Sequence, residues 1–235
     1  MKIKFHHILI LAAAITTVSC KKDNYDAPSS QLTGFVQYQG ETLGFEYNQV
    51  TFQIFQPGYG GTAPIANAFG QDGSFNTLLF NGDYKLVVPN GQGPFIWPKN
   101  AAGNPDTINV AVNGGQTLNL EVTPYWMIRN QNISAAGGSV NATFKLDKIV
   151  TGADEKLVEY ASLYINKTQF VSQADNSRIA DKRISGADIA DLSNISLSVG
   201  IPSITPTQNY VFARVGVKLV GVEDMLYGPL QKISF

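Results

Sequence analysis

The imidazole and thiol groups of this chain are confined to its first twenty residues. The sequence of 235 residues contains two histidines, His6 and His7, and one cysteine, Cys20. Ser–His–Asp and Cys–His nucleophile systems require a histidine beside the nucleophile, and structural zinc sites are built from cysteine and histidine. Residues 21–235 contain neither type, so we expect no catalytic residue of these kinds and no zinc site.

Carboxylates are the remaining groups that could support acid–base chemistry. A glycosidase needs two of them about 5–9.5 Å apart, and the pairs Glu41 with Glu46 and Glu155 with Glu159 are the obvious candidates. All four stand in turn-like or solvent-facing segments, where a carboxylate is an ordinary surface charge. We therefore predict that the protein is not an enzyme.

Oxygen ligands that could hold calcium occur at Asp154 and Glu155 and again at Asp188 and Asp191. Neither group has the spacing of an EF-hand loop. No glycine-rich run precedes a helical pattern as a phosphate-binding loop requires. The sequence therefore predicts no metal and no cofactor.

Aromatic residues in loops are better candidates for recognition. The stretch 90–100 carries Phe95 and Trp97 among Asn, Gln and Lys residues, and Tyr59 stands in a second glycine-rich segment. Exposed rings can stack on the C–H faces of sugars while neighbouring amides bond the hydroxyls, which makes these three residues candidate sugar-binding platforms. The alternative for Phe95 and Trp97 is packing at a sandwich edge or against a second domain, because aromatic side chains bury about 150–250 Å² each.

The chain begins with the pattern of a secretory signal. Met1–Lys4 is basic, residues 8–18 are apolar or small, and Ser19 precedes Cys20. The apolar run is too short to span a bilayer, which takes about 20 residues. We expect residues 1–19 to be removed as a signal peptide.

Residues 17–20, Thr-Val-Ser-Cys, resemble the lipobox that bacterial lipoprotein signal peptidase recognises. The resemblance implies that Cys20 is lipidated and that residues 20–30 form a flexible tether, since several acyl chains on one residue anchor a protein stably. Lys21–Asn24 weakly resembles the tag that directs lipoproteins to the outer leaflet, although it could equally be plain tether. An ordinary signal peptide with a chance cysteine is the alternative. The expected location is the outer membrane, on the cell surface.

The expected mature protein is mildly acidic. Removing Lys2 and Lys4 with the signal leaves 15 basic residues against 18 acidic ones. Residues 31–125 carry two lysines against six carboxylates. With no basic stripe to meet phosphates, nucleic-acid binding is not expected.

Short runs of β-forming residues recur along the chain, in one series from Leu32 to Val122 and a second from Trp126 to Phe235. Gly, Asn and Asp turn signals separate them, a spacing typical of sandwiches rather than βαβ units. We predict an all-β chain with two tandem β-sandwich domains, 31–124 and 125–235. Residues 175–189 could form a strand or a helical turn.

Residues 71–76 and 80–86 resemble the D-G-x-F and G-x-Y-x-L signature of the carboxypeptidase-regulatory or transthyretin-like sandwich. The Asp-Gly pair predicts a tight turn, followed by Phe75 and Leu78 in the core. The next strand is expected to alternate, with its inward side chains being Tyr84, Leu86 and Val88.

Residues 204–215 resemble a fibronectin type III or related immunoglobulin-like domain. The resemblance implies a tyrosine corner at Tyr210, with its hydroxyl bonded to nearby backbone and its ring packed inside.

Taken together, the lipobox, the tether, the 71–86 run and the junction at 122–125 resemble a two-domain Bacteroidetes lipoprotein family of unknown function. Its members are encoded beside Sus-like glycan-uptake systems, so the resemblance implies glycan capture near a TonB-dependent importer and a SusD-like lipoprotein. We expect a non-catalytic surface protein that binds an oligosaccharide through the first domain or an interdomain cleft. The alternative is a scaffold that docks to an importer or another envelope protein without binding sugar.

Overall fold

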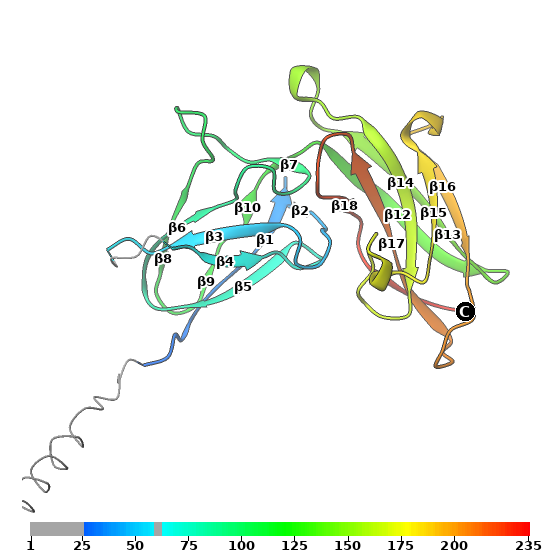
Figure 1. The fold of residues 1–235 in the computed structure, drawn as a ribbon, viewed down its shortest axis with the longest axis horizontal. Helices are drawn as coiled ribbons and strands as arrows, with labels where there is room; N and C mark the ends of the chain where they lie inside the picture. The colour runs from blue at the N-terminus through cyan, green and yellow to red at the C-terminus, as the bar shows by residue number, and fades with distance from the viewer. Residues whose placement is uncertain (1–25, 59–62) are drawn as a thin grey trace, which may run out of the picture.

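The computed structural model describes residues 26–58 and 63–235. The predicted signal peptide, Cys20 and most of the predicted tether lie outside these residues, as does Tyr59. The described chain is all-β, as predicted, and forms two tandem sandwiches side by side (Figure 1). Within the described part, no helix is long and apolar enough to cross a membrane.

The first sandwich has two main sheets and a short ladder. One sheet is organised around β1 and consists of β1 (Ser30–Tyr38), β2 (Glu41–Thr42), β5 (Ser74–Leu79), β9 (Gln116–Thr117) and β10 (Leu120–Glu121). The other has the order β4-β3-β6-β8, formed by β4 (Ile65–Ala68), β3 (Thr51–Phe55), β6 (Gly82–Val87) and β8 (Ile108–Val112). The ladder pairs β7 (Phe95–Ile96) with β11 (Thr123–Pro124).

The second sandwich packs a three-stranded sheet against a five-stranded one. The smaller has the order β12-β13-β16, with β12 (Trp126–Ala136), β13 (Ser139–Lys148) and β16 (Ile195–Gly200). The larger consists of β14 (Val158–Asn166), β15 (Ala180–Ser185), β17 (Tyr210–Leu219), β18 (Leu226–Tyr227) and β19 (Gln231–Ser234). Residues 175–189, for which the sequence predicts a strand or a helical turn, contain both: β15 is flanked by the 3-10 turns η2 (Asp175–Ser177) and η3 (Gly186–Asp188). A further 3-10 turn is η1 (Gly152–Asp154).

The turn signature in the first sandwich folds largely as its residues predict. Gly73 has φ of 78°, the left-handed conformation expected after Asp72, and Tyr84, Leu86 and Val88 are all buried. Leu78 is the exception. It is 54 % exposed, whereas Leu79 is buried, because side chains two apart share a face of a strand and Phe75, Thr77 and Leu79 therefore point inward together.

The tyrosine corner is not at Tyr210. The ring of that residue is half-buried beneath the ammonium of Lys232, 3.9 Å from the ring centre, and makes an edge contact with Phe212. A bond of the expected kind occurs in the first sandwich instead, where the buried Tyr84 hydroxyl donates to the carbonyl of Phe80 at 2.9 Å.

The two sandwiches are joined by more than the covalent junction. Most of their buried apolar residues form one continuous cluster, and a smaller cluster lies in the second sandwich. A backbone bridge pairs Gly44 with Tyr227, and the amide of Gly93 donates to the Asp224 carboxylate at 2.7 Å. The domains therefore share a specific interface, and a cleft lies between them.

Candidate functional site

The structure does not present Phe95 and Trp97 as exposed platforms. Phe95 is 4 % and Trp97 8 % exposed, so the packing alternative holds for both. The Phe95 ring lies 5.9 Å from the ring of Phe45, and the Trp97 indole N–H donates to the carbonyl of Asp106 at 2.8 Å. Burying these two large rings at the edge of the sandwich stabilises the fold, because each ring removes a large apolar area from water.

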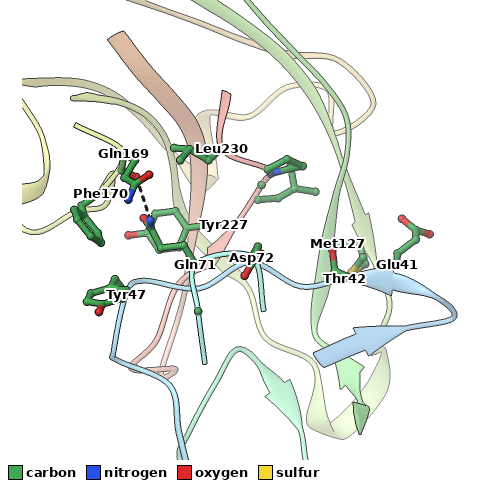
Figure 2. A pocket seen from close by; sticks show the side chains of 15 residues that line it. Glu41, Thr42, Tyr47, Gln71, Asp72, Met127, Gln169, Phe170, Tyr227 and Leu230 are labelled. Atoms are coloured by element: carbon green, nitrogen blue, oxygen red, sulfur yellow. Dashed lines mark hydrogen bonds between the residues drawn. The ribbon is translucent and has the colours of Figure 1, made fainter. Parts of the chain in front are cut away.

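A hollow of about 860 Å³ lies in a cleft between the two sandwiches. Figure 2 shows its walls, which come from the β2 region and the Gln71 turn of the first domain and from β12 and the segments after β14 and β18 of the second. We call it the interdomain cleft; its rim includes Glu41, Tyr47, Asp72, Phe170 and Leu230.

Two exposed aromatic rings, one from each domain, stand at one end of this cleft. Tyr47 is 50 % and Phe170 40 % exposed, and their ring centres are 4.9 Å apart at 59° (Figure 2). A second hollow of about 350 Å³ begins on their other side, sharing Tyr47, Gln71 and Phe170 with the first. We refer to the two adjoining hollows, with the aromatic pair that lines both, as the groove.

Local backbone geometry presents Tyr47 to solvent. It follows the buried Phe45 in a tight turn, where the Gln49 amide donates to the Glu46 carbonyl and Asn48 takes φ of 60°. Asparagine tolerates that left-handed conformation better than most residues. The turn therefore directs the Tyr47 ring away from the core and toward solvent.

Phe170 is placed by the end of β14. Asn166 is buried and its side-chain amide donates to the Phe170 carbonyl at 2.6 Å and to the Thr168 hydroxyl at 3.2 Å. Its side-chain oxygen accepts from the Lys167 amide at 2.9 Å. A single buried amide thus shapes the loop that carries the ring.

Gln71 of the first domain fixes that loop from across the interface. Its side-chain N–H donates to the Gln169 carbonyl at 3.0 Å, and its side-chain oxygen accepts from the Val171 amide at 3.2 Å (Figure 2 shows the first bond). These two bonds bracket Phe170. The separation of the aromatic pair therefore depends on one glutamine.

Replacing Gln71 by alanine should loosen the Phe170 loop without unfolding the protein. Loss of three interdomain hydrogen bonds, to Gln169, Val171 and Arg214, should cost about 1–3 kcal/mol of stability. Hydrogen exchange should speed up at the amides of residues 169–171. Gln116→Ala, an exposed glutamine far from the interface, is the control and should leave exchange at 169–171 unchanged; equal exchange in both variants would contradict the assignment.

Arg214 lies beneath the groove and is fully buried. From β17 its guanidinium donates to the carbonyl of Phe45 at 3.1 Å, the carbonyl of Gln71 at 3.2 Å and the side-chain oxygen of Gln71 at 3.3 Å, and it stacks 4.3 Å from the centre of the Tyr227 ring. Burial lowers its pKa to about 10, against the opposing charges of Glu46 and Asp72, so it remains positive at neutral pH. One side chain therefore ties the second domain to both first-domain segments that border the groove.

A cluster of tyrosines and one methionine packs behind Arg214. The hydroxyls of Tyr160, Tyr164 and Tyr227 approach the sulfur of Met225 at 3.5–3.9 Å, and the Tyr227 hydroxyl accepts from the Gln173 amide at 3.0 Å. Burial raises the pKa of Tyr164 and Tyr227 well above the ordinary value. These hydroxyls therefore stay neutral and serve to pack the interface.

Three of the four carboxylates considered for catalysis form an ion pair or a hydrogen bond. Glu41 forms a two-pronged pair with Arg129, at 2.6 and 3.0 Å, and Glu155 pairs with Lys148 at 3.4 Å. Glu46 accepts a long bond of 3.4 Å from the Tyr227 hydroxyl.

The calcium candidates are not brought together. The Asp191 carboxylate accepts from the amide and hydroxyl of Ser193, which holds its pKa below the ordinary value. In the part of the chain that the structure describes, no group of three or more His, Cys, Asp or Glu residues could hold a metal ion.

Two family models together match most of the described chain. Residues 30–123 match the family model described as "Protein of unknown function (DUF3823) N-terminal domain", and residues 126–232 match "Domain of unknown function (DUF3823_C)". No curated protein sequence matches the chain significantly.

Solved structures show the same two-domain architecture. A DUF3823 family protein from Parabacteroides merdae is 34 % identical, with a TM-score of 0.75 over 89 % of this chain and 100 % of its own. One from Bacteroides ovatus is 30 % identical, with a TM-score of 0.76 over 88 % and 99 %. A protein from Bacteroides uniformis, named as a candidate carbohydrate binding protein, is 17 % identical, with a TM-score of 0.66 over 89 % and 100 %, and shares the fold.

Proposed function

This chain belongs to the DUF3823 family of two-domain proteins, and from that premise we propose that it is a non-catalytic glycan-binding lipoprotein of a bacterial surface, with the groove between its domains as the binding site. The observation that carries the proposal is the exposed Tyr47–Phe170 pair at one end of the interdomain cleft. Large rings are ordinarily buried, so a pair left in a cleft and held there by specific bonds is a recognition feature.

The surroundings of the pair suit a sugar chain. Pyranose rings offer C–H faces for stacking and hydroxyls for hydrogen bonding, and the groove supplies both apolar and polar groups: the rings and Leu230 on one hand, Thr42, Gln71 and Asp72 on the other. Ligand sites commonly lie at domain interfaces and combine apolar lining with a few fixed polar groups. The similarly folded B. uniformis protein named for carbohydrate binding is consistent with this use.

The proposed location rests on the beginning of the sequence. A lipid on Cys20 would hold the protein at the outer membrane, and the ten residues from there to Ser30 span at most about 35 Å when extended. The groove would then work close to the surface, beside a TonB-dependent importer and a SusD-like partner. Incorporation of labelled palmitate into wild-type protein, but not into Cys20→Ala, would test the anchor.

Replacing both Tyr47 and Phe170 by alanine should abolish glycan binding with little loss of stability. Two aromatic contacts of about 1–3 kcal/mol each sum to at least about 2 kcal/mol, which predicts at least about 30-fold weaker affinity. Affinity electrophoresis across dietary and host polysaccharides, followed by calorimetry on any that bind, measures the effect. Phe35→Ala, an exposed aromatic of similar accessibility on β1, is the matched control. Unchanged binding by the double variant, or no binding of any glycan by the wild type, would refute the site or the function respectively.

A second candidate function is docking without sugar. Leu78 and Phe80 are 54 % and 47 % exposed. They lie at the C-terminal end of β5 in the first sandwich. A protein partner could cover them. This function predicts a stoichiometric membrane complex that Leu78→Ser disrupts and that forms without glycan.

A further inference from the structure

The ionisable groups that line the groove are all acidic. Glu41, Glu46 and Asp72 contribute to its walls, and no lysine, arginine or histidine does so among the residues the structure describes. The asymmetry extends to the first domain as a whole, which carries six carboxylates and two lysines over residues 31–125. A ligand in the groove therefore meets negative charge directly.

The nearby arginines are already occupied. Arg129 donates through its Nε and Nη2 to Glu41 and through its Nη1 to Asp147 at 2.9 Å. Arg214 offsets part of the carboxylate charge from below, but it is sealed from solvent, and its Nη1 and Nη2 atoms donate to the Phe45 carbonyl and to Gln71. Neither guanidinium is available to form the two-pronged pairs by which proteins recognise carboxylate or sulfate groups.

Asp72 supplies the opposite kind of contact. One of its carboxylate oxygens accepts from the amide and hydroxyl of Ser74, at 3.1 and 2.6 Å, and the other has no hydrogen bond to a described residue. The side chain is exposed at the rim of the cleft. A carboxylate oxygen is a strong acceptor for sugar hydroxyls and a repulsive neighbour for an anion.

We propose that the groove selects uncharged glycan chains and rejects chains that carry carboxylate or sulfate groups, with Asp72 and Glu46 as the residues that set this preference. The inference rests on the glycan-binding function proposed above. An anionic sugar entering the groove would lose its hydration, find no cationic donor and face two carboxylates. An uncharged sugar would lose only hydroxyl hydration, which Asp72 and Gln71 can replace.

The test compares each polysaccharide with its own oxidised form. Xyloglucan, galactomannan, starch and arabinan are presented as such and after selective oxidation of primary hydroxyls to carboxylates, together with polygalacturonate and chondroitin sulfate as natural anionic chains. For the chain that binds, oxidation should weaken affinity at least about tenfold at low ionic strength, and by less at high salt, because salt screens repulsion between exposed charges.

The variants assign the preference to particular residues. In Asp72→Asn/Glu46→Gln the difference between neutral and oxidised chains should shrink at least about threefold, while Asp83→Asn, an exposed carboxylate outside the groove, should leave it unchanged. If Asp72→Asn disturbs the turn that Asp72 forms with Ser74, Glu46→Gln alone is used instead. It should also reduce the difference in affinity between neutral and oxidised chains.

Three other outcomes separate the inference from the function beneath it. Tight binding of oxidised or sulfated chains that still requires Tyr47 and Phe170 would overturn the selectivity and leave glycan binding intact. A difference between neutral and oxidised chains that the double variant does not change would overturn the assignment to Asp72 and Glu46. Failure of every neutral and anionic chain to bind would remove the glycan-binding function and this inference with it.

Discussion

Replacing Arg214 by alanine is expected to lower the free energy of unfolding by about 3–5 kcal/mol, the range for removing a large, fully buried side chain. The change opens a cavity in the interface and leaves the Phe45 carbonyl without its guanidinium donor, while the Gln71 carbonyl keeps its bond from the Phe45 amide and the Gln71 side-chain oxygen keeps its bond from the Val171 amide. The carbonyl left unsatisfied adds to the cost of the cavity. The native interface should therefore open or unfold well below the wild-type midpoint.

Urea titration followed by circular dichroism measures this effect, and the matched control is Arg178→Ala. Arg178 pairs on the surface with Asp175 and Asp181, so its loss should cost no more than about 1 kcal/mol. Arg214→Met, which retains most of the buried volume, should fall between the two. A loss below about 1 kcal/mol for Arg214→Ala would show that the guanidinium does not hold the interface.

The second large effect is expected at Trp97. Its replacement by alanine should cost about 3–5 kcal/mol, because an indole that is 92 % covered fills the edge of the first sandwich. Trp97→Phe should cost less, since one six-membered aromatic ring is kept while the five-membered ring of the indole and its bond to the Asp106 carbonyl are lost. Trp126, the other tryptophan of the chain, remains as the fluorescent reporter of unfolding.

This prediction also guards against a misreading. A Trp97→Ala variant that loses glycan binding would do so by unfolding the first domain, whereas Tyr47→Ala removes an exposed ring and should change stability by no more than about 0.5 kcal/mol. If Trp97→Ala instead kept wild-type stability and lost binding, the original assignment of Trp97 as a stacking platform would be restored.

Much of the fold follows from local pattern. Alternating apolar residues and Gly-containing turns placed most strands of both sandwiches, and the turn at Asp72-Gly73 forms with the predicted left-handed glycine. The failure at Leu78 has a plain cause, since it stands three residues after Phe75 and strand side chains repeat every two. The wrong tyrosine corner arose because the sequence motif around Tyr210 does not report how Lys232 and Phe212 cover the ring.

The groove could not be derived in the same way. Tyr47 and Phe170 are 123 positions apart, lie in irregular segments, and meet because the two domains pack together through contacts that include Gln71 and Arg214. Periodicity carries no information about such loops. The sequence did offer one clue, the interdomain cleft as a place for aromatic residues, while it assigned the rings to Phe95 and Trp97 rather than to this pair.

The position of β1 determines how the molecule resists mechanical force. Strand β1 starts at Ser30, shortly after Cys20, the proposed site of the lipid anchor. It pairs antiparallel with β5 on one edge and parallel with β9 and β10 on the other. A pull transmitted from Cys20 runs along the strand axis, so the ladder bonds on both edges are sheared together instead of opening one after another. If the protein is held by a lipid on Cys20, drag from a flowing medium would load the hydrogen bonds of β1 in shear.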